Sequence, residues 1–382
     1  MPCMEKVIRR CSSLFRGKNT DDVEISKLMR IDDPLLWCHD VGRHSGGDFS
    51  FAVLQSNRTM EDKGQVEVGR YLTFVGIYDG HGGPDASHYI LNHLSSHFSR
   101  IIRERGSMSE EVLGNSFAKV EAEFLAYVKR LGEIKPAVTV TGSCCLVGVF
   151  CKNTLYIANL GDSRAVAGTL DKKKKIVAEQ LTQDHNASRE EIRQELKSMH
   201  PDDPEIVVFK NGAWRIKGIT QISRAIGDGY MKKQEFAVDS KFGKFQLPGR
   251  LSKPILSAEP SISTRVLSHQ DKFFIFASDG LWEHLTNQAA VEIVHRNPRP
   301  GVAKRLIIAA LLEFIKVTKI EYTDFVQMGK GNRRSFHDDI TVVVVFIDNE
   351  LSWDSNVPIP EISVRGFCDP KIPSDVSRLL EN

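Results

Sequence analysis

The fold is decided around Val75-Gly76-Ile77-Tyr78-Asp79-Gly80-His81-Gly82-Gly83, where a run of apolar and small residues ends in an acid followed by glycines. The apolar run predicts a buried strand, and Asp-Gly-His-Gly-Gly predicts a turn at its end. A carboxylate at a strand end, followed by glycines, presents both its own oxygens and a bare backbone carbonyl to a cation. We therefore expect Asp79 to bind a metal ion, with an ordinary Asp-Gly tight turn as the alternative.

The composition is that of an ordinary soluble globular protein, with 41% hydrophobic and 26% charged residues in 382. A net charge of +2 gives no reason to expect a nucleic-acid partner. Seven scattered cysteines indicate a reducing intracellular compartment, which is compatible with the cytoplasm, the nucleus or a membrane surface. No apolar run is long enough for a transmembrane segment. We interpret the basic segment 1–18 as a frayed terminus rather than a membrane-surface helix or an organelle-targeting segment.

Hydrophobic periodicity predicts pairs of helices that alternate with blocks of strands. Short connections between successive strands indicate antiparallel pairing, and hence an α+β fold rather than a doubly wound parallel sheet. We expect an N-terminal tail (1–34), one folded domain (35–348) and a loosely packed C-terminal tail (349–382). Helices are predicted at 85–105, 109–128, 188–199, 285–295 and 302–316, and strands at 49–54, 71–78, 143–151, 154–160, 164–169, 175–181, 271–278 and 340–347.

Asp79 is one of several acids that lie at or near the ends of predicted strands. Unpaired carboxylates repel one another, so a folded protein tolerates a group of them best around cations. Oxygen ligands suit Mg²⁺ or Mn²⁺, whereas Zn²⁺ would require clusters of His and Cys. His81 is expected either to stabilise its turn or to donate a proton near the metal-bound water or the leaving group. The other acidic sites are Glu61-Asp62, Asp162, Asp228, Asp279 and Asp338-Asp339.

Five short motifs occur in the order seen in protein phosphatases of the PP2C (PPM) family, which the chain resembles from about Gly42 to Ile347. The resemblance implies a four-layer αββα sandwich, in which two antiparallel sheets are flanked by helices and metals lie in a cleft at one end. It makes 35–348 a phosphatase domain and implies a monomer that acts on phosphoprotein substrates. The motifs are Asp79-Gly80-His81-Gly82-Gly83, Gly161-Asp162-Ser163-Arg164, Ser223-Arg224-Ala225-Ile226-Gly227-Asp228, Ser278-Asp279-Gly280-Leu281-Trp282 and Asp338-Asp339-Ile340-Thr341; Gly142-Ser143-Cys144-Cys145 and Leu181-Thr182-Gln183-Asp184-His185-Asn186 resemble the plant branch.

The family pattern implies a site for two Mn²⁺ or Mg²⁺ ions per subunit. In that pattern Asp79 bridges both ions, and the backbone carbonyl of Gly80 binds one of them directly or through water. Asp279 and Asp338 hold the other ion. Glu61 contacts the site through water.

The same pattern implies supporting roles for other residues. Asp162 and Asp228 are candidates for a third, weakly bound ion or for orienting the ligands. Asp338 rather than Asp339 is expected to bind metal, because the family's metal acid is the first of that pair.

The expected chemistry follows from the charges. Two cations about 3.5–4 Å apart lower the pKa of a bridging water and clamp the phosphoryl oxygens. The resulting hydroxide attacks phosphorus in line, and the seryl or threonyl oxygen leaves as His81 protonates it.

The chain departs from the family pattern at Arg58, the candidate for holding the substrate phosphate. The family usually has Arg, two residues, Met, Glu and Asp, whereas Arg58-Thr59-Met60-Glu61-Asp62 sets the Arg one residue closer. In a strand that shift turns the side chain to the other face, and a bulge would restore it.

Other classes of protein fit the sequence less well. Cys3 and Arg9 have the spacing of a cysteine phosphatase but lack a preceding strand and a glycine cradle, and no Walker-type loop indicates a kinase or ATPase. A two-metal nuclease would usually carry basic residues along a nucleic-acid path. A catalytically weak or inactive binding protein on the same fold is the main alternative, although Asp79, Asp279 and Asp338 are all present.

Overall fold

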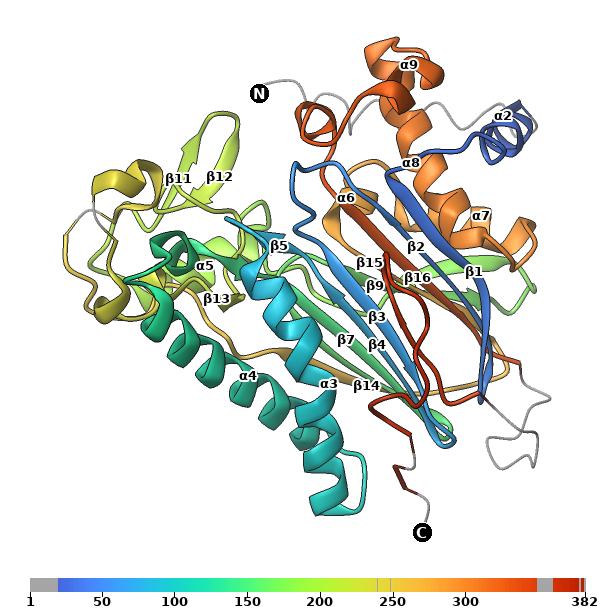
Figure 1. The fold of residues 1–382 in the computed structure, drawn as a ribbon, viewed down its shortest axis with the longest axis horizontal. Helices are drawn as coiled ribbons and strands as arrows, with labels where there is room; N and C mark the ends of the chain where they lie inside the picture. The colour runs from blue at the N-terminus through green and yellow to red at the C-terminus, as the bar shows by residue number, and fades with distance from the viewer. Residues whose placement is uncertain (1–19, 239, 248, 349–359, 378, 381–382) are drawn as a thin grey trace.

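Two six-stranded antiparallel sheets pack face to face, and helices cover the outer side of each (Figure 1). The structure is a computed structural model that describes residues 20–238, 240–247, 249–348, 360–377 and 379–380. The predicted α+β fold, an αββα sandwich of four layers, is confirmed.

The first sheet has the apolar strand β16 near its centre, between β2 and β15. Every residue of β16 is buried, as its sequence Ile-Thr-Val-Val-Val-Val-Phe predicts for a central strand. The order in this sheet is β1 (Leu36–His44), β2 (Gly47–Leu54), β16 (Ile340–Phe346), β15 (Asp271–Ala277), β9 (Arg164–Leu170) and β10 (Ile176–Gln180).

The second sheet includes three strands that the sequence pattern did not predict, namely β3, β14 and β17. Buried Gln65 and Glu67 interrupt the apolar pattern of β3, and β14 and β17 are short edge strands of mixed polarity. The order is β14 (Ser261–Val266), β8 (Thr154–Leu160), β7 (Cys145–Cys151), β4 (Leu72–Tyr78), β3 (Lys63–Val68) and β17 (Ser363–Arg365).

The inner faces of the sheets meet in an aromatic core. Phe150 of one sheet lies edge-on against Phe274 and Phe276 of the other, with ring centroids 5.4 and 6.1 Å apart. Gly148 permits the close approach, because a Cβ at that position would lie 2.5 Å from the Phe276 ring. A side chain there would separate the sheets at the strand that leads to Asp279.

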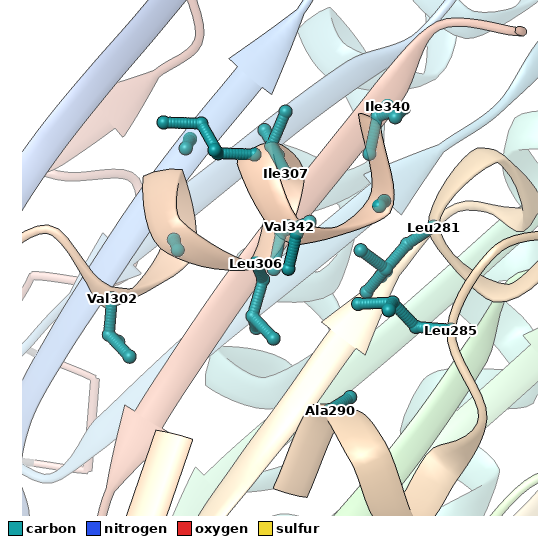
Figure 2. Close-up of a cluster of buried hydrophobic side chains, with 14 of the residues drawn as sticks. Leu281, Leu285, Ala290, Val302, Leu306, Ile307, Ile340 and Val342 are labelled. Carbon is teal, nitrogen blue, oxygen red and sulfur yellow. The ribbon is translucent and has the colours of Figure 1, made fainter. Parts of the chain in front are cut away.

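Each outer helical layer buries an apolar stripe on its own sheet. Helices α3 and α4 pack on Leu72, Phe74 and Tyr78 of β4, whereas α6, α7 and α8 pack on the first sheet. Figure 2 shows the apolar cluster between the first sheet and its helices, which includes Leu306 of α8, Leu281 of α6 and Val342 of β16. The helices are α2 (Thr20–Leu28), α3 (Asp85–Arg105), α4 (Glu110–Leu131), α5 (Glu190–Met199), α6 (Asp279–Trp282), α7 (Asn287–Arg296), α8 (Val302–Thr318) and α9 (Tyr322–Gln327).

Short elements lie at the end of the sandwich where β4 and β8 finish. A three-stranded sheet of order β13-β6-β5 joins three of the recognised motifs, and the β11–β12 hairpin lies further out (Figure 1). Within the described residues, no helix is long and apolar enough to cross a membrane. These elements are β5 (Gly80–His81), β6 (Gly142–Ser143), β13 (Ile226–Gly227), β11 (Val207–Lys210), β12 (Ala213–Ile216) and the 3₁₀ helices η1 (Pro136–Val140), η2 (Gly229–Met231), η3 (Gln234–Phe236), η4 (Ser240–Phe245) and η5 (Arg333–Ser335).

The described parts of both predicted tails pack on the folded domain, so the C-terminal tail is not loosely packed there. At the N-terminal side, Ile25 of α2 is buried against the first sheet's helical layer, and Asp33 is buried in an ion pair. At the C-terminal side, β17 pairs with β3 and Val376 is buried against α3. Apolar residues separated by polar ones gave too weak a periodic signal in these segments. The segment 1–18 and residues 349–359 lie outside the described residues.

The ion pair of Asp33 with Arg333 ties the N-terminal segment to the loop before β16. Both side chains are fully buried, and the guanidinium donates to the two carboxylate oxygens at 2.8 and 3.0 Å. Arg333 also donates to the backbone oxygens of Val326 and Met328 and lies over the Phe325 ring.

We expect Asp33→Ala to lower the free energy of unfolding by about 3–5 kcal/mol, because it leaves the buried Arg333 charge without its partner. Urea unfolding followed by circular dichroism measures the loss. The matched control is Asp32→Ala, whose side chain is exposed and whose effect should stay within about 0.5 kcal/mol. Equal stabilities of the two variants would contradict the assignment.

Candidate active site

Four of the predicted acids come together because strands of both sheets end at the same side of the sandwich. Asp79 follows β4, and Asp162 follows β8. Asp279 follows β15, and Asp338 precedes β16; antiparallel pairing of these two strands brings their acids to one edge. The buried Asp62 lies beside them.

The electrostatics of this group show how closely the acids interact. Burial raises the pKa of Asp79 well above its usual range, and the charges of Asp279, Asp62, Asp338 and Asp162 raise it further. Burial and neighbouring acids also raise the pKa of Asp62 to about 8 and that of Glu61 to about 7. Such a cluster is costly when ionised unless a cation neutralises it.

Asp279 has an oxygen that the protein leaves without a partner. Its Oδ1 is buried and accepts no hydrogen bond from the described residues. Leu281 and Leu285, in the apolar cluster of Figure 2, anchor the chain directly after it. An orphaned carboxylate oxygen among other acids, all of them hard oxygen donors, fits a site for Mg²⁺ or Mn²⁺.

Asp338 and Asp339 have different surroundings. Asp339 is buried, and its two oxygens accept hydrogen bonds from the backbone N–H groups of Ser56, Asn57 and Glu61 at 2.7–2.9 Å. Asp338 is partly exposed, and its Oδ1 accepts from the Asn57 side chain at 3.0 Å. Asp339 therefore shapes the loop before β3, which leaves Asp338 as the acid suited to a cation.

Asp162 lies close to Asp79 and to a thiol. Ligand atoms of Asp79, Cys144 and Asp162 all lie within 4.8 Å of one another. The Asn186 amide donates to Asp162 Oδ2 at 2.6 Å, and the Cys144 thiol lies 3.3 Å from Oδ1. These two contacts fix the orientation of the Asp162 carboxylate.

His81 is paired with Asp228 rather than left free in its turn. Nε2 of His81 lies 2.8 Å from Oδ2 of Asp228. Burial is the largest influence and lowers the pKa of His81, but the charges of Asp228, Glu61 and Asp162 and the hydrogen bond to Asp228 together raise the net pKa. The pair requires glycine at Gly142, where a Cβ would lie 2.2 Å from Asp228 Oδ2 and 2.4 Å from His81 Nε2. Asp228 therefore orients the His81 ring, and its carboxylate is paired with His81.

Glu121 of α4 holds the turn that carries Asp228, a connection that the sequence did not reveal. Its carboxylate accepts hydrogen bonds from the backbone N–H of Gly227 and from Lys232 Nζ, both at 2.8 Å. Lys232 is buried and also donates to the Ala225 carbonyl at 2.7 Å. The only sequence signal was an isolated acid on a helix face, which is indistinguishable from a surface residue.

Two further charged residues near the acids, Glu283 and Arg334, were not predicted from the sequence. One residue that was predicted, Arg58, lies at the surface. Glu283, one helical turn after Asp279, is exposed and adds to the charges that raise the pKa of Asp279, after burial and Asp162. Arg334 forms an ion pair with Asp338 at 2.7 Å. Arg58 is exposed, and no described acid forms an ion pair with it. The available signal was spacing: Glu283 and Arg334 each lie four residues from a motif acid, a separation that brings side chains together on a helix.

Comparison with known proteins identifies the family. The model of the protein phosphatase 2C family matches residues 54–319. The chain is 60% identical over 348 residues to "Probable protein phosphatase 2C 43" from Oryza sativa subsp. japonica, covering 91% of this chain and 90% of the relative. It is 55% identical over 352 residues to "Probable protein phosphatase 2C 68" from Arabidopsis thaliana, covering 91% and 90%. The chain belongs to the protein phosphatase 2C family.

Its activity is thus that of a metal-dependent protein serine/threonine phosphatase of plant type. Two solved structures share its fold at low identity. A serine-threonine phosphatase 2C from Toxoplasma gondii is 17% identical with a TM-score of 0.58, covering 82% of this chain and all of that one. A C. elegans sex determining protein is 17% identical with a TM-score of 0.59, covering 80% and 65%.

The phosphatase should gain more stability from Mg²⁺ at pH 8 than at pH 6. Because folding raises the carboxyl pKa values from about 4 to 7–8 for Asp62 and Glu61, the stability of the metal-free protein falls as pH rises through that window. Saturating Mg²⁺ should raise Tm by about 5 °C or more at pH 8 and by less at pH 6, where protons compete.

Differential scanning fluorimetry with EDTA or MgCl₂ measures this difference. Asp79→Asn removes one charge from the cluster, so it should raise Tm in EDTA at pH 8 and abolish most of the Mg²⁺ effect. An Mg²⁺ effect of equal size at both pH values, or one retained in Asp79→Asn, would contradict the linkage.

Proposed function

We propose that this phosphatase hydrolyses phosphoserine and phosphothreonine in proteins with two Mg²⁺ or Mn²⁺ ions held by Asp79, the Gly80 carbonyl, Asp279 and Asp338. The observation that carries the proposal is the group of acids that raise each other's pKa, together with the buried Asp279 Oδ1 that lacks a hydrogen bond. Glu61 would contact the ions through water. When bound, two such ions acidify water and neutralise phosphoryl oxygens.

The chain's own residues would prepare the reaction by fixing these acids before substrate arrives. Asp339 holds the backbone that carries Glu61, and a hydrogen bond from Thr341 Oγ1 orients Asp62 at 2.8 Å. Ser87 donates to the Glu61 carbonyl, which links this loop to α3. Asp162, already oriented by Asn186, is our candidate for a third, weaker ion. Such prior ordering lowers the cost of arranging the site during the reaction.

We assign His81 the role of proton donor to the leaving oxygen. Its pairing with Asp228 favours the protonated imidazole and leaves Nδ1, for which the described residues offer no hydrogen-bond partner, as the atom that delivers the proton. Asp228 then acts through His81 rather than as a ligand of the third ion.

We propose a monomeric catalytic unit in which this chain supplies every ligand. The five described cysteines are free thiols, as expected for the proposed reducing compartment. The substrate would be a phosphoprotein, because the site opens at the surface where Asp338 and His81 are partly exposed.

Removing the Asp79 carboxylate tests the proposal. Asp79→Asn, which would weaken metal binding, or EDTA added to the wild type, which would remove the metal, should lower kcat/KM for a phosphothreonine peptide by about 1000-fold. Asp202→Asn, an exposed acid on another loop, is the control and should behave as wild type. Activity that survives chelation would instead favour a metal-independent or inactive site.

His81→Gln tests the proton donor. Loss of a general acid should slow hydrolysis of a phosphoserine peptide by about 100-fold or more, because an alkoxide leaves poorly without a proton. p-Nitrophenyl phosphate has a stable leaving anion, so its kcat should fall less than about tenfold. Equal losses on both substrates would assign His81 to binding rather than to protonation.

A further inference from the structure

Arg334 lies beside one of the proposed metal ligands, where it can reach a substrate phosphate. Its guanidinium lies 2.7 Å from Asp338 Oδ2, and its side chain is 51% exposed. Among the described Arg and Lys residues, Arg334 is the one that forms an ion pair with a proposed metal ligand.

The predicted phosphate residue, Arg58, lies on the adjacent loop. The N–H of Gly331 donates to the Ser56 carbonyl at 2.7 Å, and a Cβ on Gly331 would lie 3.2 Å from the Arg58 Cβ. The loop of Arg334 therefore packs directly on the segment in which Arg58 is one residue out of the family's register. A cation from the neighbouring loop can take the place that the shift leaves.

Arg334 is presented by an ordered segment. It lies in η5, directly after Arg333, whose buried guanidinium binds Asp33 and two backbone carbonyls. On its other side, the His337 carbonyl accepts a hydrogen bond from Ser56 Oγ at 2.6 Å. With both flanks fixed, Arg334 loses little further backbone entropy when its exposed side chain binds a ligand.

We infer that Arg334, rather than Arg58, binds the phosphoryl group of the substrate. The inference rests on the proposed function, since Asp338 must exchange its partner from the guanidinium to a metal ion. Arg334 would then keep its charge beside the metal site and present a planar fork that matches two phosphoryl oxygens. It would neutralise an oxygen that faces away from the ions. The ligand is a phosphomonoester dianion, and its hydrolysis product, inorganic phosphate, serves as the probe.

The test compares full-length wild type with Arg334→Ala, Arg334→Lys and Arg58→Ala. Isothermal titration calorimetry measures inorganic phosphate binding to the Mg²⁺-loaded proteins, and a separate titration measures Mn²⁺ binding. Arg334→Ala should weaken phosphate binding and raise KM for a phosphopeptide by about 10-fold or more. Arg334→Lys should recover part of the loss, because it keeps the charge without the fork. Arg58→Ala should stay within about twofold of wild type by the same argument.

Mn²⁺ affinity separates phosphate binding from a role in the metal site. Arg334→Ala should bind Mn²⁺ at least as tightly as wild type, because a competing cation is gone from Asp338. A tenfold loss of Mn²⁺ binding would overturn the inference and make Arg334 a support of the metal site. Unchanged phosphate binding in Arg334→Ala, or a larger loss in Arg58→Ala, would also overturn it while leaving the two-metal proposal standing. A wild type that binds neither Mn²⁺ nor phosphate would overturn both.

Discussion

Mutual repulsion of closely packed carboxylates is the constraint around which the candidate active site of this protein is organised. Asp62 and Asp79 belong to one sheet, and Asp279 and Asp338 to the other, so packing the two sheets forces their charges together. The apolar core can impose this because a shift of either sheet would undo contacts such as Phe276 on Gly148. The sandwich therefore holds its acids close enough for a cation to bind several of them at once.

Around this group, buried polar contacts determine which acid remains available. Asp339 is satisfied by backbone N–H groups and becomes part of the loop's structure, whereas its neighbour Asp338 is partly exposed and pairs with Arg334. Buried polar contacts also fix Asp228: Glu121 and Lys232 hold the turn that carries it, and Asp228 in turn pairs with His81. Identical residue types thus take different roles according to their burial and the groups that they contact.

The sequence predicted the strongly periodic elements well. Residues 85–105 were predicted as a helix with the bounds that α3 has, and the Val-rich strand β16 was found because a buried strand reads as a continuous apolar run. β3 was missed because Gln65 and Glu67 are buried polar residues, which an alternating pattern cannot reveal. The motif acids were found because each follows a recognisable strand end. Arg334 and Glu121 escaped because their importance depends on contacts with residues distant in sequence, and no local pattern encodes them.

The position of β16 in the first sheet has a consequence for how the chain folds. β16 comes from the far end of the domain, yet it lies between β2 and β15, which are made earlier during synthesis. Until it inserts, those two strands expose unpaired backbone edges to any other chain nearby. Pairing over such sequence separation is also slow to form. A nascent molecule that stalls before residue 340 would therefore be exposed to aggregation at the sheet that later supplies half of the active site.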